Sequence, residues 1–186
     1  MEMTSTRKIP APIETVWAAL NDTAILAACI PGCDSIDADG ENAFRIALAA
    51  RVGPVAAKFS GRMQLADIDP PRGYTLTFDG QGGAAGFAKG EAKVSLSAAE
   101  NGVATAMSYT VKAQVGGKIA QIGSRLVDGA AQKLADDFFG RFADAMAAKQ
   151  GIAPVPAASP PRRWIRYVAL ALLVGILGYL FMRMKQ

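Results

Sequence analysis

Few side chains of this 186-residue sequence could do chemistry, and its two cysteines come first. Cys29 and Cys33 are spaced C-x-x-x-C, and the sequence contains no histidine. A zinc site takes about four nitrogen, sulfur or oxygen ligands, so these two thiols alone do not form one. A reducing compartment also disfavours a disulfide between them. We therefore expect no metal site, and we interpret the cysteines as partly buried thiols near a loop.

Acid–base catalysis also lacks its usual residues, because histidine is the commonest general base. Asp136 and Asp137 come closest to a carboxylate pair, but adjacent helical residues point about 100° apart, which is typical of a solvated face. The sequence contains no G-x-S-x-G motif, Walker loop or dinucleotide fingerprint. Tyr74 and Tyr109 are the main polar groups on the inner face of the sheet predicted below. We therefore expect a protein that is not an enzyme and has no cofactor of its own.

The N-terminal third predicts one strand and two short helices. Residues 1–10 form the strand, and an amphipathic helix follows at residues 13–20, with Glu14 in its first turn, where the helix dipole favours an anion. Asp22 lies in the cap of a second short helix, Ala24–Ala28. The Pro31-Gly32 turn ends it.

From Ser35 to Val115 the apolar period changes from about four residues to two. This alternation predicts five antiparallel strands joined by turns rich in glycine and proline, with one face wet and one face apolar. The predicted inner face carries Phe44, Leu48, Phe59, Met63, Phe78, Gly90, Leu96, Met107 and Tyr109.

After Gly116-Gly117 the period becomes helical again. Apolar residues recur every four positions, and such a stripe drifts by about 40° per step around a helix, which suits one long helix across a twisted sheet. The order of elements predicts an α+β fold of the helix-grip type, with residues 1–149 as one domain. The stripe consists of Ile122, Leu126, Ala130, Leu134, Phe138, Phe142 and Met146.

Small residues interrupt the large ones on the inner face, at Gly61, Gly80, Ala88 and Gly90 for example. We interpret this pattern as an apolar cavity beneath the helix; the alternative is that the glycines only allow curvature and close packing. The helix side of the predicted cavity consists of Ile119, Ile122, Leu126, Ala130 and Leu134, and its rim of Ile25, Leu26, Ile30 and Pro31.

Residues 162–186 have the pattern of a membrane anchor. The run between Tyr167 and Met182 is uncharged, and with its flanks it approaches the roughly 20 residues that a helix needs to cross a bilayer. A buried helix of a soluble core is the alternative, but such a helix usually keeps a polar face. Basic and aromatic residues mark both ends, as at membrane interfaces: Arg162, Arg163, Trp164, Tyr167, Tyr179 and Arg183.

The net charge of +4 also belongs to this segment, because five basic residues follow Pro161. We therefore expect contact with anionic lipid and not with nucleic acid. Residues 150–161 predict a proline-rich linker, which at about 3.1 Å per residue would span roughly 35 Å. The N-terminal residues do not resemble a secretory signal. We expect a single-pass C-terminal anchor that holds the domain at the cytoplasmic face of the inner (plasma) membrane.

Several motifs resemble a known family. Ile9–Trp17 and Ile30–Cys33 are similar to the start of START-like (SRPBCC, Bet v 1-type) proteins. Together with Gly53–Val55, Phe59–Gly61 and Gly86–Gly90, they resemble the CoxG family, the G subunits of carbon monoxide dehydrogenase, over residues 1 to about 148. The resemblance implies a helix-grip fold with a deep apolar cavity. It also implies association with a molybdenum hydroxylase of the carbon monoxide dehydrogenase type, which such proteins bring to the membrane.

The expected function is therefore a membrane-anchored, non-catalytic adaptor for that hydroxylase. Its cavity would take up a lipophilic small molecule, and a respiratory quinone is the expected ligand because the enzyme's electrons must reach the membrane. One alternative is a START-like lipid carrier. Another is a cyclase or dehydratase acting on a lipophilic substrate, in which Tyr74 or Tyr109 would serve as acid or base.

Overall fold

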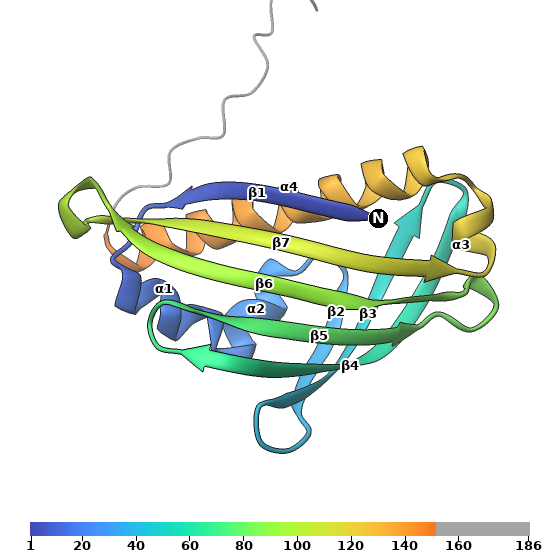
Figure 1. The fold of residues 1–186 in the computed structure, drawn as a ribbon, viewed down its shortest axis with the longest axis horizontal. Helices are drawn as coiled ribbons and strands as arrows, with labels where there is room; N and C mark the ends of the chain where they lie inside the picture. Colours follow the sequence, from blue (N-terminus) through green and yellow to red (C-terminus); the bar gives the residue numbers. More distant parts are fainter. Residues whose placement is uncertain (152–186) are drawn as a thin grey trace, which may run out of the picture. The chain divides into compact units, whose positions relative to one another are not determined.

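One antiparallel sheet of seven strands wraps around one long helix in the computed structural model, which describes residues 1–151 (Figure 1). The strand order β1-β7-β6-β5-β4-β3-β2 is a six-stranded meander whose last strand also pairs with the first strand of the chain. The predicted α+β helix-grip fold is confirmed for these residues. The elements are β1 (Glu2–Ile9), α1 (Ile13–Leu20), α2 (Thr23–Cys29), β2 (Cys33–Ala38), β3 (Ala43–Val52), β4 (Val55–Asp69), β5 (Gly73–Gln81), β6 (Phe87–Ala99), β7 (Ala104–Gly116), α3 (Lys118–Gln121) and α4 (Ser124–Lys149).

The structure describes only the first two residues of the predicted linker at 150–161. The rest of that linker and the predicted anchor at 162–186 lie outside the described residues. Within residues 1–151, no helix is both long and apolar enough to cross a membrane.

Strand β2 was not among the five strands that the alternation predicts. It is only six residues long and is paired with β3, with Ile36 opposite Ile46. Ile36 is its one buried residue, and polar residues flank it on both sides. A single buried position gives no period, so only the pairing with β3 defines this strand.

The predicted single helix after Gly117 is divided into two. Helix α3 is a single turn, and α4 begins after Gly123, whose φ of +96° a side chain would disfavour. The stripe of apolar residues also changes character along α4. Phe142 and Met146 are 0% exposed, whereas Leu126 is 52% and Leu134 39% exposed. Because the four-residue step drifts around the helix, Leu126 is turned towards solvent, whereas Phe142 and Met146 face the core.

The closed core lies where the C-terminal half of α4 meets α1 and the adjoining ends of β6 and β7. Thr105, fully buried, donates a hydrogen bond from its hydroxyl to the carbonyl oxygen of Ala11 at 2.8 Å. This bond satisfies both groups and fixes the segment that leads into α1. The core consists mainly of Ile9, Val16, Leu20, Val94, Leu96, Met107, Tyr109, Phe142 and Met146.

We expect Phe142→Ala to lower the free energy of unfolding by about 3–5 kcal/mol, because it leaves a cavity in the closed core. Leu126→Ala removes a large apolar side chain from the exposed end of the same helix, and we expect it to cost less than about 1 kcal/mol. Urea unfolding followed by circular dichroism measures both. Equal losses in the two variants would contradict the division of α4 into a packed and an unpacked half.

Candidate functional site

An apolar cavity of about 540 Å³ lies between the inner face of the sheet and the N-terminal half of α4. It occupies the end of the domain at α3, away from the closed core at α1. Its volume is within the range of small-molecule sites in proteins. The apolar residues that line it are Met1, Pro31, Ile46, Leu48, Ala49, Ala50, Val52, Phe59, Met63, Leu76, Phe78, Ala88, Val111, Ala113, Val115, Ile119, Val127, Ala130, Ala131 and Leu134.

The glycines of the inner face serve two different purposes. A Cβ at Gly61 would lie 2.5 Å from the carbonyl oxygen of Asp79, and one at Gly90 would lie 2.1 Å from that of Lys112. Those two positions are therefore glycine because neighbouring strands approach closely. Gly80 differs, because the nearest atom to its Cβ would be 3.5 Å away. Gly61 and Gly80 both border the cavity, but a side chain would fit only at Gly80 of the two, so close packing accounts for Gly61 and Gly90 and added volume for Gly80.

Half of the predicted wall residues line this cavity: Leu48, Phe59, Met63, Phe78, Ile119, Ala130 and Leu134. Leu96, Met107 and Tyr109 have the predicted inward orientation, but they lie further along β6 and β7 and belong to the closed core. Ile122 and Leu126 have methyl groups 3.7 Å from a Cβ built at Gly53, at the tip of the β3–β4 hairpin. They therefore contact the hairpin and not the cavity. Phe44 and Gly90 also lie outside its lining.

Several residues that line the cavity were not predicted from the sequence. Ile46, Leu76, Val111 and Val115 continue the alternation of their strands, so the period of two could have found them. Val127 and Ala131 lie one position after members of the helical stripe. The drift of that stripe, followed along the helix, would have indicated them.

Hydrogen bonds tie the segment of the predicted rim to the sheet and cap its helix. The backbone N–H of Ala49 donates to the carbonyl oxygen of Gly32 at 2.8 Å, and Gly32 has a φ of +72°. Asp22 caps α2 by accepting from two backbone N–H groups. Of the predicted rim residues only Pro31 lines the cavity; Ile25 and Leu26 pack against the closed core, and Ile30 follows them at the end of α2.

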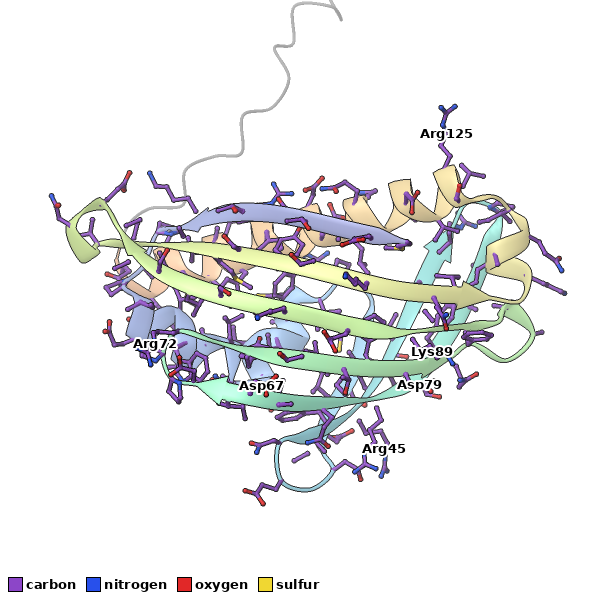
Figure 2. The ribbon with its side chains drawn as sticks, in the orientation of Figure 1. Arg45, Asp67, Arg72, Asp79, Lys89 and Arg125 are labelled. Atoms are coloured by element: carbon purple, nitrogen blue, oxygen red, sulfur yellow. The ribbon has the colours of Figure 1, made fainter. Side chains whose placement is uncertain are left out.

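The cavity presents few titratable side chains to its interior. Arg51, Arg62 and Asp79 border it, but they are exposed, and the strand alternation directs their side chains to the opposite face of the sheet. There Arg62 pairs with Asp39 at 3.3 Å, and Asp79 lies opposite Lys89 on β6 (Figure 2). The arrangement therefore favours binding by shape and apolar burial.

The two inner tyrosines lie outside the cavity. Burial raises the pKa of Tyr74 to about 12, and its ring meets that of Trp17 edge-on at 5.9 Å. Tyr109 stacks on Phe139 with ring centroids 5.1 Å apart, and its buried hydroxyl has no hydrogen-bond partner within the described part of the chain. Neither lines the cavity.

The cysteines are also unsuited to chemistry. Burial raises the pKa of the Cys29 thiol, and burial together with the neighbouring Asp34 raises that of Cys33. Both are therefore weak nucleophiles at neutral pH. Among residues 1–151 there is no group of three or more side chains that could hold a metal ion.

The helix-grip sheet, the closed core at one end and the apolar cavity at the other define a protein of the START-like (SRPBCC, Bet v 1-type) class. Within that class, residues 6–147 match the family described as the carbon monoxide dehydrogenase G subunit (CoxG). This match extends over most of the sequence, so the chain belongs to the CoxG family.

Solved structures agree with this assignment. A conserved protein from Geobacillus kaustophilus is 33% identical with a TM-score of 0.76, and the match covers 80% of this chain and 97% of that one. The Zhui aromatase/cyclase from Streptomyces sp. R1128 is 12% identical (TM-score 0.60; 81% and 95% covered), and Ara h 8.0201 is 15% identical (TM-score 0.56; 80% and 98%). The last two share only the fold with this chain. No curated protein sequence matches it.

The pKa of Tyr74 predicts how stability changes in base. Unfolded, this phenol has a pKa of 10.0, so the folded state keeps a proton that the unfolded state loses between about pH 10 and 12. The stabilisation is fully present below pH 10 and is lost as the pH rises through 12. We expect the free energy of unfolding to fall more steeply from pH 10 to 12 in the wild type than in Tyr74→Phe. Parallel urea-unfolding profiles would contradict this assignment.

Proposed function

We propose that this protein is a non-catalytic adaptor that binds a lipophilic small molecule in its cavity and serves a molybdenum hydroxylase of the carbon monoxide dehydrogenase type at the membrane. The observation that carries the proposal is the apolar cavity itself, because the side chains that enclose it from the inner face and from α4 are apolar. Such a lining favours aliphatic chains and rings, and each buried methylene contributes about 0.8 kcal/mol. A respiratory quinone, with its isoprenoid chain, has this chemistry.

Two properties of the site favour binding over catalysis. Asp79, the one carboxylate that borders the cavity among residues 1–151, points by strand alternation to the other face of the sheet, away from a substrate inside the cavity. Tyr74, with a pKa of about 12, is a poor proton donor or base at neutral pH. These properties weigh against the cyclase or dehydratase alternative.

The partner and the location of the proposed adaptor follow from the family and from the sequence. The family description names a component of carbon monoxide dehydrogenase. The sequence, with two cysteines and no histidine, has no pattern for an iron–sulfur cluster or a flavin, so we assign the redox centres to the partner. The predicted anchor at 162–186 would keep the adaptor at the inner membrane, beside the quinone pool.

Ligand binding is tested by filling the cavity. We expect Ala130→Phe to lower the affinity for a quinone with a short isoprenoid chain at least tenfold, because the new ring occupies the space between α4 and the sheet. Gln132→Phe adds the same ring on the exposed side of the same helix and serves as the matched control. Quenching of intrinsic tryptophan fluorescence by the quinone measures both. Unchanged affinity in Ala130→Phe would contradict the assignment of the cavity as the site.

The adaptor role is tested in the native organism. We expect deletion of the gene to move the hydroxylase from the membrane fraction to the soluble fraction, with its activity towards a soluble electron acceptor unchanged. The full-length chain should restore the original distribution, and a chain that ends at residue 151 should not. An unchanged distribution after deletion would contradict recruitment.

A further inference from the structure

Three connections meet at the α3 end of the domain: residues 51–55 at the tip of the β3–β4 hairpin, 82–86 between β5 and β6, and 117–126 from the end of β7 into α4. We call these residues the cavity end. Contacts between them hold the end together, since a Cβ at Gly117 would lie 2.5 Å from the Cα of Gly86. Arg51, Val52 and Ile119 of this set also line the cavity, so the surface formed here is continuous with the site.

The cavity end exposes large apolar side chains. Leu126 is 52% exposed, and Ile122, which is partly exposed, lies with it against the hairpin tip. Exposure alone does not distinguish this end, because Ile68 and Val103 at the opposite end are 37% and 66% exposed. The distinguishing property is the charge that surrounds the apolar residues.

All charged residues of the cavity end are basic: Arg51, Lys118 and Arg125. None of the three forms an ion pair with another residue of the described range 1–151, and Figure 2 shows Arg125 pointing away from the domain. The nearest acidic residue along the chain, Asp128, follows within the first turn and a half of α4.

The opposite end carries both charges, and most of them are paired with one another. Its turns carry Asp39, Glu41, Asp67, Asp69 and Glu100, but Asp39 pairs with Arg45 and Arg62, Asp69 with Arg72, and Glu100 with Lys8. The two ends therefore differ in unpaired charge: the basic residues around the exposed apolar ones at the cavity end have no ion-pair partner within residues 1–151, whereas most charges of the opposite end are paired.

We propose that the cavity end docks on the surface of an anionic lipid bilayer. Lys118 and Arg125 would contact lipid phosphates while Leu126 and Ile122 enter the boundary of the acyl chains, as basic amphipathic surfaces do. This inference rests on the proposed function, because docking places the cavity against the phase in which a lipophilic ligand dissolves.

The predicted tether permits this orientation. Helix α4 has 26 residues and is about 39 Å long, so the chain leaves the helix at the end opposite to α3. The linker that the sequence predicts at 150–161 would span roughly 35 Å when extended. The two lengths are similar, so a C-terminal anchor would not prevent the cavity end from reaching the bilayer.

The test uses the full chain with one new cysteine at either end of the domain, Gln121→Cys on α3 or Val103→Cys before β7. Both positions are exposed, and the unsubstituted chain is the control for background labelling of Cys29 and Cys33. Each new thiol carries an environment-sensitive fluorophore, and the vesicles contain a nitroxide-bearing lipid as quencher. One set of vesicles is half phosphatidylglycerol and the other is phosphatidylcholine alone.

We expect the label at position 121 to be quenched in the anionic vesicles and the label at 103 to remain unquenched. In the 121-labelled chain, Lys118→Glu or Arg125→Glu should each lower the ratio of quenched to unquenched label at least roughly fivefold, because each removes the attraction between a basic residue and an anionic surface. About 1 M salt should have the same effect.

Equal quenching at positions 121 and 103, or quenching that does not depend on lipid charge, would overturn the proposal. The proposal would also be overturned if no bilayer quenched the label at 121 while the soluble hydroxylase shielded that label from solvent. The basic surface would then be a protein interface. Quinone affinity of the charge-reversed chains, measured in parallel by tryptophan quenching, separates the two claims. Docking without quinone binding would contradict the proposed function alone, and quinone binding without docking would contradict this inference alone.

Discussion

The packing of Phe142 and Met146 between α1 and the sheet determines how the rest of the domain is arranged. These two residues are fully buried and fix the C-terminal half of α4. The N-terminal half is then held over the sheet at a distance, with alanines at its inward positions 130 and 131. Because α4 is packed at its C-terminal half and carries small residues at its N-terminal half, a cavity remains beneath the N-terminal half while the core stays closely packed.

This arrangement separates the residues that stabilise the fold from those that would bind a ligand. Strands β6 and β7 pass through both regions, with Leu96 and Met107 in the closed core and Ala88 and Val115 at the cavity. Substitutions at the two ends of one strand therefore have different consequences. Those near α1 change the free energy of unfolding, whereas those near α3 change the volume available to a ligand.

The sequence predicts the fold well because its periods are local. Alternation in β4, from Phe59 to Met63, defines the inner face without knowledge of any other strand. The boundary between core and cavity is not local, because it depends on which half of α4 meets α1. Tyr109 and Leu96 have the right orientation yet lie in the closed core for this reason. Strand β2 is defined only by its pairing with β3. The break at Gly123 depends on a positive φ, which the spacing of apolar residues does not indicate.

The pairing of the first strand with the last has a consequence for synthesis of the chain. Glu2 lies opposite Lys112 and Ile9 opposite Thr105, so β1 leaves the ribosome roughly a hundred residues before its partner. Until β7 emerges, the apolar side of β1 and the segment that enters α1 have nothing to cover them. Pairs so distant in sequence form slowly, and an unpaired strand is a site for aggregation. Nascent chains shorter than about 116 residues should therefore depend on chaperones, and the domain should close in one late step when β7 and α4 arrive together.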